Sequence, residues 1–271
     1  MRSVILLLPL LLWSCCDGPK YPEVLNPLDE PPDTTILEPG EGEEFATPEV
    51  VCRWQGSHRF VQEFRFRIDG GTWSSWDALN NTSFVLDEGE HSLEVAGRIP
   101  AEQGYAAIEE ESPAVRRFAV DAIEGPALWL KPRRTTVQRG EEVTLWVMAE
   151  DVANLMAAHV EIQFDGSRLS WLEEADISPL AGPFLGRSGG EVVLLGRVDQ
   201  AAGRGILDLG VAGGEPRGVD TAGSDTLAMV RFRASARGTV EVALTDSVAM
   251  RDPANQALGL ETLESSVVVI D

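Results

Sequence analysis

Polar and apolar residues alternate along residues 157–164, in the second half of the chain. Successive side chains on a β-strand point to opposite faces, so the polar residues of this segment share one face. Charged residues on two later predicted strands join them on the same side of a sheet. The candidate binding residues are His159, Glu161, Gln163, Glu191, Arg197 and Asp208. A flat face that mixes hydrogen-bonding and charged groups suits contact with another protein.

Catalytic and metal-binding patterns are weak in this sequence. It contains no GxSxG, P-loop, GxGxxG or EF-hand pattern, and its three histidines are scattered without an HExxH motif. The acidic runs 109–111 and 173–174 place neighbouring carboxylates on opposite faces of a strand, which predicts solvated charge rather than a catalytic pair. Glu150, Asp151 and Asp165 offer oxygen ligands of the kind that calcium takes, a minor alternative. We therefore expect a protein that is no enzyme and needs no cofactor.

The amino-terminal residues 1–15 have the features of an export signal. Arg2 precedes an apolar run of nine residues, Val4 to Leu12, which is too short to cross a bilayer as a helix. The run ends Leu12-Trp13-Ser14-Cys15, which resembles the lipobox of bacterial lipoproteins. The resemblance implies that Cys15 is lipidated and anchors the mature protein on a membrane surface. The alternative is an ordinary cleaved signal peptide.

Residues 16–32 are rich in proline and polar residues, which predicts an extended tether behind the anchor. The whole chain has 44 acidic and 22 basic residues, a net charge of -22. That balance disfavours nucleic acid as a partner, because binding phosphate backbones requires basic patches.

Short alternating segments separated by turn residues fill residues 33–122 and predict a β-sandwich. The expected strands cover residues 34–37, 50–55, 60–68, 73–76, 82–86, 91–98 and 115–120. The stretches PPDTTI, FRFRIDGGTWSSW and EGEHSLEVAGR resemble a bacterial Ig-like module, which implies an Ig- or fibronectin-like fold.

Three aromatic residues of this first sandwich suggest sugar stacking, namely Trp73, Trp76 and Tyr105. The favoured interpretation is structural: one tryptophan packs in the core and the other braces the hairpin. Cys52 has no partner cysteine nearby, and we expect it to be a buried free thiol.

Residues 126–271 show the same period of two and predict a nine-stranded jelly roll. The expected strands cover residues 128–130, 143–149, 157–164, 169–173, 191–197, 205–211, 227–234, 239–245 and 266–270. The last of these contains the continuous apolar run 267–270, as expected for a strand that is buried on both faces. The fold class is thus all-β, with two sandwiches.

Three stretches of this second half resemble the cohesin domain. They are VQRGEEVTLWVMAEDVANLMAAHVEIQFDGSRLSW, GSDTLAMVRFRASARGTVEVAL and SSVVVID. Gly166 stands where the family usually has proline, and the glycine-rich segment 181–218 matches poorly. The resemblance implies a receptor module for dockerin-type partners. Carbohydrate-binding modules share the same architecture, so the alternative is a lipoprotein that binds a polysaccharide and assists its breakdown. We expect a non-catalytic lipoprotein on the outer membrane or cell surface.

Overall fold

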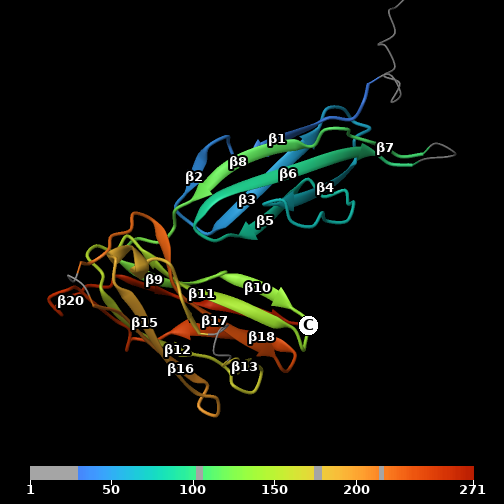
Figure 1. Ribbon diagram of the computed structural model, residues 1–271. Coiled ribbons are helices and arrows are strands. Elements are labelled where there is room, and N and C mark those ends of the chain that lie inside the picture. Colours follow the sequence, from blue (N-terminus) through green and yellow to red (C-terminus); the bar gives the residue numbers. More distant parts are fainter. Residues whose placement is uncertain (1–29, 102–105, 174–178, 214–216) are drawn as a thin grey trace, which may run out of the picture.

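The computed structural model describes residues 30–101, 106–173, 179–213 and 217–271. The predicted signal segment, Cys15, most of the tether and Tyr105 lie outside these ranges. The described residues form two β-sandwiches joined by a short connection (Figure 1). Within those ranges no helix has the length and apolar character needed to cross a membrane.

The first sandwich consists of a three-stranded sheet and a five-stranded sheet, and all its strands fall within residues 33–122. The three-stranded sheet has the order β1-β3-β5, and the other has the order β2-β8-β6-β4 with β7 paired to β6. The strands are β1 Thr34–Glu38, β2 Glu43–Phe45, β3 Glu49–Gly56, β4 Glu63–Ile68, β5 Asn81–Val85, β6 Gly89–Ile99, β7 Ile108–Glu109 and β8 Ala114–Val120.

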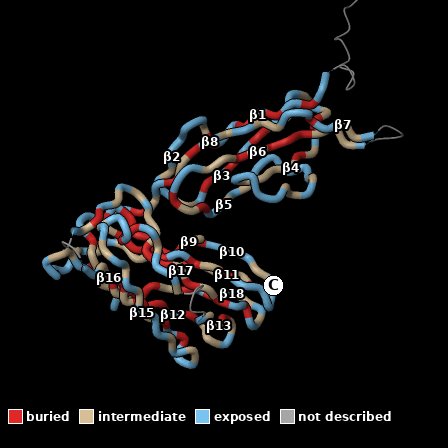
Figure 2. Tube along the Cα trace, viewed as in Figure 1, coloured by how far each residue is buried: buried red, intermediate tan, exposed pale blue. Residues whose placement is uncertain are grey.

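Alternation along β3 explains why these sheets face one another. Val50, Cys52 and Trp54 are buried, and the residues between them are exposed. Cys52 is a free, fully buried thiol, as predicted, and burial raises its pKa to about 12. Figure 2 shows the buried residues in red along the inside of both sandwiches.

The predicted strand 73–76 is wrong. Asp69 and Gly70 adopt positive φ and start a tight turn, as the Asp-Gly-Gly pattern indicated. The returning segment contacts β4 through hydrogen bonds such as Ser74 N–H to Phe66 O, at 2.8 Å, and through an isolated bridge between Phe64 and Asp77. Arginine side chains of β4 also stack on its two tryptophans. The segment runs beside the sheet edge without extending the ladder.

The described part of the second sandwich has strands β9 to β22, of which nine have four residues or more. Each of the nine predicted segments contains a strand, the segment 169–173 only the short β13, whereas β10, β14, β19, β20 and β21 were not predicted. Its long sheet has the order β10-β22-β18-β12-β16-β15, with β19 and β20 beside β12, and its facing sheet has the order β13-β17-β11-β9-β21, with β14 beside β17. The nine longer strands are β9 Ala127–Lys131, β10 Arg134–Val137, β11 Glu142–Glu150, β12 Ala157–Gln163, β15 Glu191–Asp199, β16 Arg204–Ala212, β17 Ser224–Ala234, β18 Gly238–Leu244 and β22 Ser266–Ile270. The shorter ones are β13 Leu169–Trp171, β14 Leu180–Ala181, β19 Ala249–Arg251, β20 Ala257–Leu258 and β21 Thr262–Glu264, and a short 3₁₀ helix covers Leu185–Ser188.

The prediction that the closing strand β22 is buried on both faces is wrong. Ser266, Val268 and Ile270 are buried, but Val267 and Val269 remain partly exposed. β22 lies between β10 and β18, so its backbone is fully paired while one of its faces meets solvent. The apolar run therefore correctly predicted a strand with neighbours on both sides, but it did not predict that one face of this strand is partly exposed.

The two sandwiches meet at a buried ion pair. The Arg133 guanidinium lies 2.5 Å from the Glu88 carboxylate, and their side chains are only 8% and 5% exposed. The backbone N–H of Arg133 donates to Asp87 at 2.6 Å, and a small apolar cluster, which includes Trp129, packs beside the pair. A cavity of about 490 Å³ lies at the same junction, lined by carboxylates from both sandwiches together with Lys131. The β12-β16-β15 part of the long sheet faces away from this contact (Figure 1).

Candidate functional site

The outer face of strands β12, β16 and β15 carries all six predicted binding residues. The register pairs His159 with Asp208 and then Asp208 with Leu195, so these three side chains share a face. Glu161 and Gln163 follow on β12, while Glu191 and Arg197 lie on the same side of β15 as Leu195. We call this surface the outer face. The prediction from alternation is confirmed for the placement of these residues.

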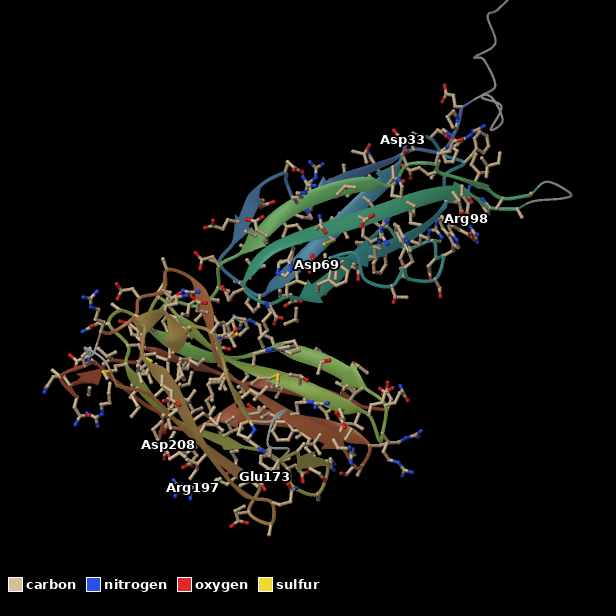
Figure 3. All side chains as sticks on the ribbon, viewed as in Figure 1. Asp33, Asp69, Arg98, Glu173, Arg197 and Asp208 are labelled. Atoms are coloured by element: carbon tan, nitrogen blue, oxygen red, sulfur yellow. The ribbon has the colours of Figure 1, made fainter. Side chains whose placement is uncertain are left out.

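A hydrogen-bonded group occupies the centre of the outer face. His159 Nδ1 lies 2.6 Å from one Asp208 oxygen, and Arg197 Nη2 lies 3.3 Å from the other. Asp208 thus bridges β12 and β15 through side chains on its two neighbours. The His159 and Asp208 side chains remain 35% and 41% exposed, so both keep hydrogen-bonding capacity for a partner. Figure 3 shows Arg197 and Asp208 together on the side of the second sandwich away from the first.

Glu161 is less available than its outward position suggested. Its side chain forms an ion pair with Arg204 of β16, and the residue is only 7% exposed. The hydrogen bond from Arg204 lowers the pKa of the Glu161 carboxyl, which keeps it ionised and committed to that arginine. Glu161 therefore holds the β12–β16 pair together and contributes little free surface.

Two apolar side chains complete the outer face, and the prediction missed them. Leu195 is 62% exposed and Val193 is 41% exposed, and both lie on β15 beside Arg197. Lying close together and surrounded by polar side chains, these two residues offer apolar contact area to another protein. The same alternation that selected Glu191 and Arg197 also places Val193 and Leu195 outward, so the signal was present in the sequence.

Trp73 and Trp76 of the first sandwich stack against arginine side chains. The Arg65 guanidinium lies 4.9 Å from the Trp73 ring centre and 4.6 Å from that of Trp76, and Arg67 and Arg98 cover the same two rings. Such cation–π contacts stabilise the segment against the sheet. The expectation that one of these two tryptophans packs in the core is wrong, since both side chains are partly exposed between the arginines. Arg98 is labelled in Figure 3.

Aromatic side chains of the second sandwich mostly face inward. Trp129, Trp171, Phe164, Phe184 and Phe232 are buried. Trp146 on β11 is 37% exposed and stands on the sheet opposite the outer face. The described part of the second sandwich therefore lacks the row of exposed aromatics that stacking on a crystalline sugar requires.

The carboxylates considered for calcium are held by other groups. Glu150 accepts hydrogen bonds from Trp129 and Ser224, Asp151 accepts one from the Gly223 N–H, and Asp165 accepts from Ser167. Among the described residues, no three His, Cys, Asp or Glu side chains gather in a way that fits a metal ion. These carboxylates cap turns and strand ends.

One acidic residue assigned to solvent is buried instead. Glu110 accepts hydrogen bonds from the N–H and hydroxyl of Thr34 and from the Gly97 N–H. Burial raises the pKa of the Glu110 carboxyl. The prediction of solvated charge is therefore wrong for Glu110. Glu109, Glu111 and Glu173 are exposed as predicted, and Glu174 lies outside the described ranges.

Comparison with known proteins finds solved structures of similar fold, but it finds no match by sequence. No family model matches the chain, and no curated protein matches it. A type II cohesin domain from the cellulosome of Acetivibrio cellulolyticus is similar at 15% identity and a TM-score of 0.44, covering 52% of this chain and 94% of that one. A non-cellulosomal cohesin from the archaeon Archaeoglobus fulgidus is similar at 12% identity and 0.42, covering 54% and 90%. A cohesin–dockerin complex from Clostridium thermocellum is similar at 13% identity and 0.42, covering 54% and 98%.

Proposed function

We propose that this chain is a non-catalytic binding protein whose outer face docks a partner protein. The observation that carries the proposal is the composition of that face. His159, Asp208 and Arg197 form a partly exposed polar centre, and Leu195 and Val193 lie beside them on a regular sheet. A flat surface with a few apolar anchors and partly exposed polar groups suits a protein better than a small molecule, which binds in a concave pocket.

The partner that we propose is a dockerin-type module. The support is the resemblance of residues 137–171, 223–244 and 265–271 to the cohesin domain. These stretches include β11, β12, β17, β18 and β22, and so supply part of both sheets of the second sandwich. The alternative ligand is a polysaccharide, and the burial of most aromatics in this sandwich makes it less favourable.

We further propose that the protein works at the cell envelope, outside the membrane. The support is the export-signal pattern of residues 1–15 and the lipobox-like position of Cys15, followed by the tether of residues 16–32. The first sandwich, for which we retain the Ig-like assignment of residues 33–122, would then separate the outer face from the membrane. Mass spectrometry of the mature amino terminus tests the anchor, because an unmodified Cys15 contradicts it.

A binding titration with two variants tests the proposed surface. The full chain is titrated with a purified dockerin-type module and, in parallel, mixed with insoluble cellulose and xylan. We expect binding to the module and an affinity about tenfold or more lower for Asp208→Lys, which reverses the central charge of the outer face. Trp146→Ala on the opposite sheet is the matched control and should bind the module as the wild type does.

Each alternative result has a distinct meaning. Equal affinity of Asp208→Lys and wild type for the module would exclude the outer face as its site. Retention by cellulose or xylan that Trp146→Ala abolishes, without binding to the module, would replace the protein partner with a polysaccharide.

A further inference from the structure

Strand β15 is the longest strand with an unpaired edge in the described part of the protein. It has nine residues and pairs with β16 through all nine without a register shift, and it ends the sheet order. The other described strands at sheet ends have six residues or fewer. β14 is close to β15 but pairs with β17, and Pro179 lies against the inward side of Gly196. Among the described residues, no strand pairs with the outward backbone groups of β15.

This edge lacks several of the features that normally prevent strands from associating, and the charged side chains that it does carry, Glu191, Arg197 and Asp199, are of both signs. Natural proteins protect sheet edges with prolines, lysines, bulges or very short strands, because a free edge pairs readily with another chain. β15 contains no proline, no lysine and no bulge. It instead exposes Val193 and Leu195 on the outward side. An edge of this length and composition is suited to pairing with another strand.

The sequence of β15 is complementary to itself in one antiparallel register. In this register a second β15 runs antiparallel to the first, and Leu194 of one copy lies opposite Leu194 of the other. Each other residue then lies opposite the residue that is equally far from Leu194 on its other side. Glu191 then lies opposite Arg197, and Val193 lies opposite Leu195, and symmetry repeats each pair once. Shifting the crossing to Leu195 would instead oppose Glu191 with Asp199, two like charges.

We propose that two copies of this chain associate edge to edge through β15, with the two-fold axis at Leu194. The long sheet then continues from one copy into the other, and the two outer faces lie side by side. Arg197 is free to take part, because its side chain is 68% exposed and its contact with Asp208 is 3.3 Å long. The proposal concerns the chain alone and holds whatever partner the outer face binds.

A charge-swap experiment tests this association. Sedimentation equilibrium of the full chain in a density-matched non-ionic detergent measures the dimer dissociation constant without any partner present. Arg197→Glu and Glu191→Arg each turn two symmetric ion pairs into like-charge pairs, so each should raise that constant about tenfold or more. The double variant Glu191→Arg/Arg197→Glu restores opposite charges and should return the constant toward the wild-type value.

Two further variants separate pairing from general charge effects. Arg237→Glu makes the same charge change at an exposed site between β17 and β18, and it should leave the dimer unchanged. Asp208→Asn removes the negative charge that Arg197 contacts within its own chain and should also leave the dimer dissociation constant unchanged. Circular dichroism confirms that each variant is folded. A monomer at every concentration, a dimer insensitive to Arg197→Glu, or a double variant no better than the single ones would overturn the proposal.

Discussion

Removing Arg133 from the buried Arg133–Glu88 pair should destabilise the protein more than removing the charge of Glu88. Arg133→Met keeps the volume of the side chain and deletes its charge. Glu88 is then left buried without its cation, and its other oxygen still accepts a hydrogen bond from the Ala122 N–H at 2.8 Å. Leaving one charge of a buried pair uncompensated costs about 3–5 kcal/mol.

The reverse change is expected to cost less. In Glu88→Gln, Arg133 keeps its 3.3 Å contact with the half-exposed Glu264 carboxylate, and its guanidinium still lies over the Trp129 ring. The remaining charge is therefore partly neutralised, and we expect a loss of about 1–2 kcal/mol. The double variant should be more stable than Arg133→Met alone, since it leaves no unpaired buried carboxylate.

Urea unfolding followed by tryptophan fluorescence measures these differences for the wild type, both single variants and the double variant. Arg133→Lys is the matched control that keeps the charge while losing the planar guanidinium, and it should lie between wild type and Arg133→Met. A loss below about 0.5 kcal/mol for Arg133→Met would show that the pair is solvated rather than buried. Strict additivity of the two single changes would show that the groups do not interact.

Three further predictions test other parts of the structure. Gly205→Ala would place a Cβ atom 2.2 Å from the Trp171 ring, so thermal unfolding should show a loss of about 1–3 kcal/mol, whereas Gly210→Ala, with its nearest atom at 3.6 Å, should be tolerated. Cys52 should resist alkylation at pH 8 in the folded protein and react fully in urea, as followed by peptide mass spectrometry; rapid labelling of the folded protein would contradict its burial and raised pKa. The pKa of Glu161 is lower in the folded protein than in the unfolded chain. The stability that Glu161 contributes is therefore present above its unfolded pKa and is lost as the pH falls through its folded pKa. The difference in unfolding free energy between wild type and Glu161→Gln should narrow in acid, and a difference that does not depend on pH would contradict this.

Local alternation was sufficient to predict most strands of the second sandwich and the side of the sheet to which each candidate residue points. His159 and Asp208 are 49 residues apart in the chain, yet both were assigned to one face, because strand periodicity determines orientation without knowledge of the pairing. The specific contact between them depends on the register of β12 against β16, which periodicity does not provide.

Features that depend on contacts distant in the sequence were not predicted. Arg133 and Glu88 belong to different sandwiches, and nothing near either residue signals a buried partner. Glu110 belongs to an acidic run of the kind usually exposed to solvent. It is buried instead, and its carboxylate accepts hydrogen bonds from the Thr34 hydroxyl and two backbone N–H groups. Trp73 and Trp76 follow a hairpin signal that predicts a returning strand, and stacking on three arginines holds them beside the sheet instead.

At the candidate site, the sequence pattern predicted the direction of Glu161 but not its burial. Its outward direction was predicted from alternation, but its accessibility was not, because Arg204 on the neighbouring strand covers it. Val193 and Leu195 alternate with inward residues in the same way as Glu191 and Arg197, so the period of two predicts their outward direction as well.

Hydrogen–deuterium exchange of the full chain, with and without a bound dockerin-type module, tests the proposed binding surface most directly. We expect the module to slow exchange in β12, β15 and β16, residues 157–163, 191–199 and 204–212, and to leave β11 and β17 unchanged. Protection confined to β11 and β17, or to the first sandwich, would contradict the claim that the outer face binds the partner.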